Sequence, residues 1–264
     1  MDFVELVFDS FKKTYGIDLS KEKEINIDNM VFPNYCVQNI LNLEYEKDYR
    51  DFEYCRIINK LFGFGYLKEK TSYYEEEGVI KIEPNDIVFD CGANTGIFSL
   101  YGAYKGKWCY AFEPSTLICH YLRNTQKYTN KISIVPYGLS NENKKEYFYQ
   151  TDNPGAARFE EYHIPDYHKV LYRELNEVIT INDFVRSTGA IPNFIKMDIE
   201  DAEVKAIEGA KETIKLYKPK CAISIHEANK DKFDYIKSFF PKEYKFVTKS
   251  APFYDPVLLC YVGE

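Results

Sequence analysis

The feature that most constrains the fold is a series of short apolar runs. They are residues 87–89, 108–112, 132–135, 194–197 and 221–225. Runs of this length suit strands that are buried on both faces, as in a parallel sheet. Four of the runs lead into a polar or ionisable residue, and these residues are Asp90, Glu113, Asp198 and His226. A buried strand has no packing reason to end in such residues, so they indicate a site.

Amphipathic stretches separate the runs and predict helices. Residues 97–104 and 115–125 follow the first and second runs, with Ser115 as the expected N-cap. Apolar residues recur every three or four positions over 204–217, and this helix is expected to end before Pro219. The alternation predicts an α/β doubly wound sheet, in which ligands bind outside the carboxyl ends of the strands. The alternative is that the strand-end acids are solvated ends or helix caps.

The length of 264 residues suits one large domain or one domain with an extension. Residues 1–77 form the predicted extension, mainly helical, with apolar residues at helical spacing over 45–61. Residues 78–264 form the predicted α/β domain. We expect the extension to pack on this domain or on a second subunit, which would make a homo-oligomer.

Composition narrows the classes of partner. The net charge of −7 argues against a nucleic-acid surface, which needs clustered Lys and Arg. No apolar run approaches the roughly 20 residues of a membrane span, and the N-terminus has no signal-peptide pattern. The seven cysteines include no CxxC pair and no zinc-type spacing. We therefore expect a cytoplasmic protein with reduced thiols.

The loop after the first run, DCGANTG over residues 90–96, indicates the kind of ligand. Its spacing matches neither G-x-G-x-x-G nor a P-loop, and no lysine follows to meet phosphate. Asp90 favours a ligand with positive charge, while the helix beginning near Thr95 favours an anion. Glu113 lies 23 residues after Asp90, a spacing that suits an acid binding both ribose hydroxyls. S-adenosylmethionine has this combination of charges and no phosphate.

Five segments in order resemble the FkbM-type S-adenosylmethionine-dependent methyltransferases. They are VFDCGANTGIFSL, AFEPSTLICHYLRN, GLSNENKKEYFY, ITINDFV and NFIKMDIEDAEVKAIEGAKETIKLYKPKCAISIH. The resemblance covers residues 78–226, and the last segment is the most specific. It implies a class I methyltransferase with a Rossmann-like, seven-stranded sheet and one antiparallel strand. The implied reaction is methylation of a hydroxyl, typically on a sugar or a polyketide-type product.

The resemblance also implies roles for individual residues. The cofactor-binding set is Asp90, Gly92, Ala93, Asn94, Thr95, Gly96, Glu113 and Pro114. Asp198 and Glu200 match the acids of the family's last block, at the mouth where the acceptor should lie. Asp201 stands where the family usually has Gly, and it is expected to cap the following helix. As a third carboxylate beside Asp198 and Glu200, it is expected either to alter the acceptor pocket or to favour a divalent cation such as Mg²⁺.

The expected catalytic residues are Asp198, Glu200 and His226. Asp198 is the first candidate for the base that accepts a hydroxyl proton, and His226 is the second. Lys196 lies within an apolar run, where it is expected to snorkel or to pair with an acid. Residues 150–178 are expected to be a long irregular lid or a surface excursion. Within this segment, Arg158 is the candidate for binding an anionic group of the acceptor.

The leading hypothesis is an S-adenosylmethionine-dependent O-methyltransferase acting on a carbohydrate or nucleotide-linked sugar. Two alternatives stay open from the residues alone. In the first, the acceptor is a small phosphorylated or amine metabolite. In the second, the chain is a non-catalytic scaffold with a degenerate methyltransferase fold.

Overall fold

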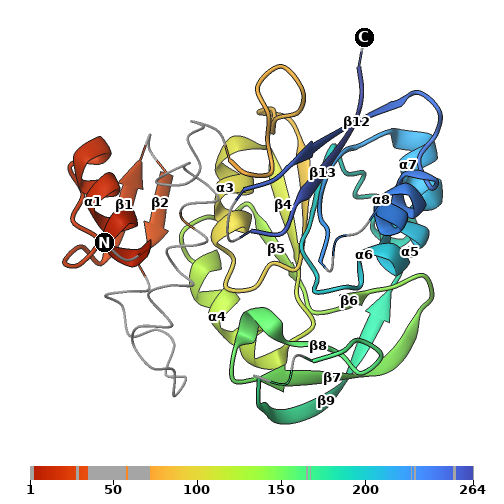
Figure 1. Ribbon diagram of the computed structural model, residues 1–264, viewed down its shortest axis with the longest axis horizontal. Coiled ribbons are helices and arrows are strands. Elements are labelled where there is room, and N and C mark those ends of the chain that lie inside the picture. Colours follow the sequence, from red (N-terminus) through yellow and green to blue (C-terminus); the bar gives the residue numbers. More distant parts are fainter. Residues whose placement is uncertain are drawn as a thin grey trace.

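A computed structural model describes residues 3–27, 30–34, 58, 72–164, 166, 168–226, 228, 230–251 and 254–263. A twisted sheet runs through the molecule and helices lie on both of its sides (Figure 1). The helix predicted over 45–61 lies outside the described residues, apart from Ile58.

The central sheet has seven strands in the order β12-β13-β11-β10-β3-β4-β5. Their bounds are β3 (Ile87–Cys91), β4 (Trp108–Phe112), β5 (Ile132–Val135), β10 (Phe194–Met197), β11 (Lys220–Ser224), β12 (Tyr244–Lys249) and β13 (Val257–Val262). Strand β13 runs antiparallel to both of its neighbours, and the other pairs are parallel. The sequence prediction of a Rossmann-like, seven-stranded sheet with one antiparallel strand is confirmed.

Two apolar cores cover the two faces of this sheet. Side chains alternate between them along each strand, so Val88 belongs to the core under α3 (Ile97–Lys105) and Phe89 to the other. The second core also contains α5 (Ile181–Thr188) and α8 (Lys230–Lys237). Helix α4 (Thr116–Gln126) begins at the predicted cap, because the Ser115 hydroxyl accepts the Ile118 N–H at 3.2 Å.

The single helix predicted over 204–217 is two helices, α6 (Glu203–Glu208) and α7 (Lys211–Tyr217). The helix is interrupted at Gly209. Its carbonyl accepts the Asn182 N–H at 3.0 Å, a bond to another segment and not to the next helical turn. A Cβ at this position would lie 2.1 Å from the Ser140 carbonyl oxygen. The break is therefore set by packing against a distant loop, which helical periodicity does not reveal.

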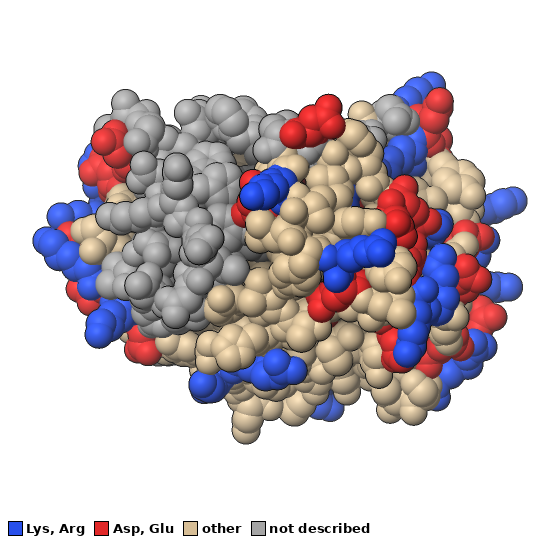
Figure 2. Space-filling view, turned by 90° about the horizontal axis from the view of Figure 1, so that it is seen from below, with Lys and Arg blue, Asp and Glu red and all other residues tan. Residues whose placement is uncertain are grey.

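A second sheet occupies the region predicted to be an irregular lid. Its strands are β6 (Gly138–Leu139), β7 (Lys144–Thr151), β8 (Arg158–Phe159) and β9 (Val170–Ile179), in the order β6-β9-β7-β8, with a 3₁₀ turn, η1 (Pro154–Ala156). Phe148, Phe159 and Val178 form its small core. The prediction of an irregular segment over 150–178 is wrong for residues 150–151, 158–159 and 170–178, which lie in strands, while the described residues of 152–157 and 160–169 contain no strand. Figure 2 shows acidic and basic side chains interspersed over the described part of the lower face.

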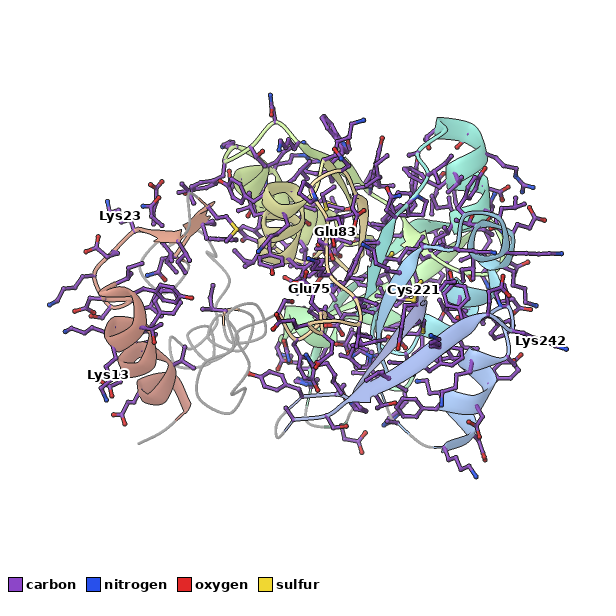
Figure 3. The ribbon with its side chains drawn as sticks, turned by 90° about the horizontal axis from the view of Figure 1, so that it is seen from above. Lys13, Lys23, Glu75, Glu83, Cys221 and Lys242 are labelled. Atoms are coloured by element: carbon purple, nitrogen blue, oxygen red, sulfur yellow. The ribbon has the colours of Figure 1, made fainter. Side chains whose placement is uncertain are left out.

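The described part of the extension contains more β-structure than predicted. Helix α1 (Phe3–Tyr15) is followed by a hairpin of β1 (Glu24–Ile27) and β2 (Met30–Pro33). The Tyr104 hydroxyl of α3 donates to the Val31 carbonyl at 3.2 Å, so the hairpin packs on the central domain. In Figure 3, Lys13 and Lys23 lie on the far side of the extension, and Cys221 lies within the sheet. Contact with a second subunit stays a prediction.

Two further features bear on the sequence expectations. Cys91, Cys109, Cys119, Cys221 and Cys260 are buried free thiols, and burial raises the pKa of Cys119 to about 12. The other two cysteines lie outside the described residues. Within the described chain, no helix has both the length and the apolar character needed to cross a bilayer.

A glycine pair tests how tightly the strand ends are packed. Gly92 and Gly189 both have left-handed φ angles, 78° and 71°. A Cβ on Gly92 would lie 2.0 Å from the Asp198 carbonyl oxygen, whereas one on Gly189 would meet nothing within 4 Å. We expect Gly189→Ala to cost about 1 kcal/mol of unfolding free energy. We expect Gly92→Ala to cost at least about 3 kcal/mol, since two backbones must separate. Urea unfolding measures both, and equal losses would contradict this packing.

Candidate active site

A cavity of about 460 Å³ lies at the carboxyl ends of β3, β4 and β10. This volume falls within the range of small-molecule sites. The cavity is lined by most of the residues predicted from the sequence, namely Gly92, Ala93, Asn94, Thr95, Glu113, Pro114, Arg158, Asp198, Glu200, Asp201 and His226. Asp90 and Gly96 do not line it. Residues of the second sheet (β6 to β9) and its connecting loops, together with Tyr74 and Asp255, complete its walls.

The loop after β3 is held in place by the end of β4. The Gly92 and Ala93 N–H groups both donate to the Phe112 carbonyl, at 3.0 and 2.9 Å. Gly92, Asn94 and Gly96 have positive φ angles, which glycine and asparagine adopt most readily. A Cβ on Gly96 would lie 2.3 Å from the Leu122 side chain, so Gly96 allows α3 to approach α4.

Asp90 is fully buried beneath this loop. Its carboxylate lies 3.0 Å from the Lys196 ammonium and accepts the Ser99 hydroxyl at 2.6 Å. Lys196 also donates to the Gly92 carbonyl at 2.8 Å. This geometry corrects the expectation that the charge of Asp90 faces a ligand, because Lys196 already balances it. The expectation that Lys196 pairs with an acid is confirmed.

Lys196 stays charged in a buried position. Burial lowers its pKa, but the carboxylates of Asp90 and Asp198 outweigh burial and raise it above its usual value. The ammonium also lies 5.7 Å from the ring centroids of both Tyr74 and Phe98. Lys196 therefore lines the cavity as a charged ammonium whose charge Asp90 already balances.

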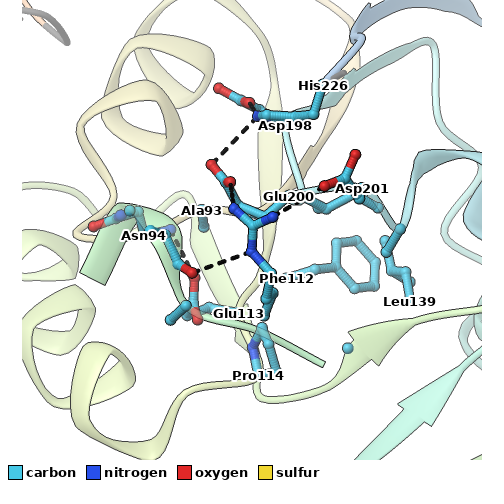
Figure 4. A pocket seen from close by; sticks show the side chains of 18 of the residues that line it. Ala93, Asn94, Phe112, Glu113, Pro114, Leu139, Asp198, Glu200, Asp201 and His226 are labelled. Atoms are coloured by element: carbon cyan, nitrogen blue, oxygen red, sulfur yellow. Dashed lines mark hydrogen bonds and ion pairs between the residues drawn. The ribbon is translucent and has the colours of Figure 1, made fainter. Parts of the chain in front are cut away.

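Glu113 lies at one end of the cavity, beside Asn94 and Pro114 (Figure 4). One carboxylate oxygen accepts the Ser115 N–H and the other accepts the Asn94 N–H, both at 2.9 Å. Burial raises the pKa of Glu113 to about 7, although the two N–H groups and Lys196 act in the opposite direction. The carboxyl group thus changes charge near neutral pH.

At the other end, Asp198, Glu200 and His226 come together (Figure 4). The His226 Nε2 atom lies 3.3 Å from a carboxylate oxygen of Asp198 and 3.3 Å from one of Glu200. Burial lowers the pKa of His226, but the Glu203 and Glu200 carboxylates outweigh burial and raise the pKa well above its usual value. The three predicted catalytic residues therefore share one polar cluster.

Asp201 and Arg158 differ from their expected roles. Helix α6 begins after Ala202 with no side-chain cap, so the prediction that Asp201 caps this helix is wrong. Its carboxylate instead binds Arg158 at 3.0 Å and Lys232 at 2.9 Å. Arg158 also binds Glu200 at 2.7 Å. Both terminal nitrogens of Arg158 thus bind carboxylates of the chain itself.

Sequence reasoning missed three residues that contact this cluster. Tyr74 donates its hydroxyl to Asp198 at 2.7 Å, and a carboxylate oxygen of Asp255 lies 3.6 Å from His226 Nε2. No local pattern marks either residue. Glu203 lies 2.9 Å from His226 Nδ1. It could have been found, because it matches the final Glu of the family's most specific block.

Comparisons with known proteins identify the fold and the family. The family model described as the methyltransferase FkbM domain matches residues 90–248, more than half of the chain. The crystal structure of a methyltransferase FkbM from Methylobacillus flagellatus KT aligns with a TM-score of 0.54 and 21% identity, over 97% of this chain and 58% of that chain. Fibrillarin from Aeropyrum pernix, solved with bound S-adenosylmethionine, aligns less well, with a TM-score of 0.45, 8% identity and 69% of each chain covered.

One curated relative is similar over a shorter segment. AMB antimetabolite synthetase AmbE of Pseudomonas aeruginosa is 35% identical over 89 residues, which are 33% of this chain and 4% of that protein. The chain therefore spans a small part of AmbE and 58% of the Methylobacillus chain. The family rests on the domain match over residues 90–248, and the central sheet agrees with it. The chain belongs to the FkbM family of S-adenosylmethionine-dependent methyltransferases.

Proposed function

We propose that this protein transfers a methyl group from S-adenosylmethionine to a hydroxyl of a carbohydrate or nucleotide-linked sugar. The observation that carries the proposal is a single cavity with two different ends. One end holds the loop after β3 and Glu113, and the other holds Asp198, Glu200 and His226. Transfer of a group between two ligands requires both to be bound in one enclosed space.

The first end fits the methyl donor. Each oxygen of Glu113 accepts one N–H group, so each retains an acceptor site for one of the two ribose hydroxyls. The loop has no lysine or arginine that would bind a phosphate. When bound, S-adenosylmethionine supplies a methyl group activated by a sulfonium. The chain contributes the binding, the alignment and the exclusion of water.

The second end suits a hydroxyl acceptor. A sugar hydroxyl is a weak nucleophile, so a base within hydrogen-bond reach favours its reaction. We assign Asp198 as the group that takes the proton, with Glu200 and His226 holding the hydroxyl beside it. Carboxylates disfavour a phosphate at this end. Contact between Arg158 and an anionic group of the acceptor requires Glu200 or Asp201 to release the guanidinium.

A divalent cation belongs to the same proposal. The sequence suggested Mg²⁺ at Asp198, Glu200 and Asp201, but Asp201 is bound by Arg158 and Lys232. The remaining carboxylates, Asp198 and Glu200, face His226 instead. A cytoplasmic location also stays a proposal, as does the absence of a nucleic-acid partner, which the acidic net charge supports.

The proposal is tested by donor binding and by product formation. We expect S-adenosylmethionine and S-adenosylhomocysteine to raise the melting temperature, whereas NAD and ATP should not. At a ligand concentration a hundred times Kd, the free energy of unfolding should rise by about 2.7 kcal/mol. A methyl-labelled donor incubated with a panel of nucleotide sugars should then label one of them. Stabilisation by NAD or ATP alone would refute the donor assignment. Donor binding with labelling only of an amine would refute the acceptor class, and no ligand response at all would favour the scaffold alternative.

The pKa of Glu113 predicts a pH dependence of donor binding. The ionised carboxylate accepts hydroxyl protons better than the carboxylic acid does, and the pKa of about 7 places ionisation near neutrality. Affinity should therefore fall as pH decreases through 7, by about tenfold between pH 8 and pH 6. Isothermal titration at both pH values measures it. Glu113→Gln should bind weakly with no such slope; a slope kept in this variant would assign the effect to another group.

Tyr74 predicts a separate effect on catalysis. Its hydroxyl bond to Asp198 is charge-assisted, and losing it costs about 1.5–3 kcal/mol. We expect Tyr74→Phe to lower kcat for methyl transfer at least about tenfold, with donor affinity unchanged. Tyr73→Phe is the matched control, because the Tyr73 hydroxyl points to main-chain oxygens of Lys249 and Asp255. Equal kcat values for the two variants would remove Tyr74 from the site.

A further inference from the structure

We propose that Asp198, Glu200 and His226 bind one first-row transition-metal dication of the Mn²⁺ class, with Glu203 positioning the histidine. The inference deepens the proposed function and rests on it, since the same cluster lies where the acceptor hydroxyl is expected. It replaces the Mg²⁺ site predicted from sequence with a different set of ligands.

The two distances from His226 to the proposed carboxylate ligands match those between ligands of one ion. His226 Nε2 lies 3.3 Å from Asp198 Oδ1, 3.3 Å from Glu200 Oε1 and 3.6 Å from Asp255 Oδ2. Ligand atoms bonded at about 2.0–2.2 Å to a shared ion lie about 3.0–3.6 Å apart. The three proposed ligand atoms all lie within 4.8 Å of one another.

A single Nε2 proton satisfies this arrangement less fully than a dication does. Nε2 carries at most one proton, and an N–H group donates well to one acceptor. Here three carboxylates surround the same nitrogen. A dication at their centre attracts all of these groups at once, as in metal sites of mixed imidazole and carboxylate composition.

Glu203 orients the imidazole as a metal ligand requires. It is fully buried, and its Oε1 atom lies 2.9 Å from His226 Nδ1 and accepts the Ile199 N–H at 3.2 Å. A carboxylate on Nδ1 keeps a proton there, so an ion that displaces the Nε2 proton meets a lone pair directed at Asp198 and Glu200. Metal-binding histidines commonly have such a carboxylate partner. Tyr74 supports Asp198 in the same way, through its bond to Oδ2.

The charges around the cluster favour a dication. Five carboxylates meet here, those of Asp198, Glu200, Asp201, Glu203 and Asp255. The neighbouring cations already have acidic partners: Arg158 binds Glu200 and Asp201, Lys232 binds Asp201, and Lys196 binds Asp90. Among the described residues, these five carboxylates outnumber Arg158, Lys232 and the His226 imidazole, so the cluster keeps negative charge even when the imidazole is protonated.

The ligand types indicate which metal binds. Carboxylates suit Mn²⁺ and imidazole suits the later first-row dications such as Fe²⁺ and Zn²⁺, whereas Mg²⁺ prefers oxygen ligands alone and retains its water. Two carboxylates and one imidazole leave coordination positions open toward the cavity. A hydroxyl bound at one of them would have its pKa lowered by the ion, which serves the proposed reaction.

The test measures metal binding directly on the full-length protein, without donor or acceptor. After chelator treatment, we expect the protein to bind one Mn²⁺ per chain, detected by loss of the free-ion electron paramagnetic resonance signal. Mg²⁺ should compete at least about tenfold more weakly. His226→Gln and Asp198→Asn should abolish the binding, and Glu203→Gln should weaken it about 10–100-fold.

Asp201→Asn is the matched control. It removes a neighbouring carboxylate that is bound by Arg158 and Lys232, and asparagine tolerates the left-handed φ of 78° at this position. Its Mn²⁺ affinity should stay within about threefold of the parent. Thermal stabilisation by S-adenosylmethionine confirms that each variant is folded. The proposal is overturned if the parent binds no Mn²⁺, if His226→Gln binds it as tightly, or if Asp201→Asn loses it equally. None of these results affects the donor assignment, which has its own assay.

Discussion

The buried ion pair between Lys196 and Asp90 places both ends of the site. The two residues lie opposite each other on the parallel strands β10 and β3, and both are almost completely buried. Removing one partner would leave an uncompensated charge, at a cost of about 3–5 kcal/mol. The Lys196 ammonium also holds the Gly92 carbonyl, and Gly92 packs directly on the Asp198 backbone. The loop after β3 and the acids that follow β10 are therefore positioned by one interaction across two strands.

The cavity favours a cationic ligand through different residues from those the sequence suggested. Asp90 is neutralised by Lys196, so it cannot supply the attraction. The acids that line the cavity are Glu113, Asp198, Glu200, Asp201 and Asp255, and they outnumber its cationic side chains, Lys196, Arg158 and His226, which already face carboxylates. The expectation of a positively charged, phosphate-free ligand thus has physical support, although the loop acid is not its source.

Patterns among neighbouring residues were sufficient to predict the central sheet. They were not sufficient to predict the hairpin and the long-range contacts that surround the cavity. The strand runs and the Ser115 cap are signals carried by neighbouring residues, and the structure contains them. The hairpin of β7 and β9 was missed because Leu171, Tyr172 and Leu175 stay exposed, which removes the alternation of a half-buried strand. Tyr74 reaches Asp198 across 124 positions of sequence, so no window of neighbouring residues could reveal the contact. The position of Asp201 was predictable, but its ion pairs with Arg158 and Lys232 depend on tertiary packing.

Both ends of the site lie within the domain that matches the family model, and two residues that contact Asp198 and His226 lie outside it. The loop after β3 and Glu113 lie within residues 90–248, which match the family model. Tyr74 and Asp255 lie outside this range, yet both contact the acceptor cluster. The segment that bears Tyr74 is held firmly, since the neighbouring Glu75 accepts the Tyr101 hydroxyl at 2.6 Å and the Ile82 N–H at 2.8 Å. A common donor needs a conserved binding end, whereas different acceptors need different walls. We therefore infer that Tyr74 and Asp255, in segments flanking the matched domain, add to an acceptor end that Asp198, Glu200 and His226 form within it.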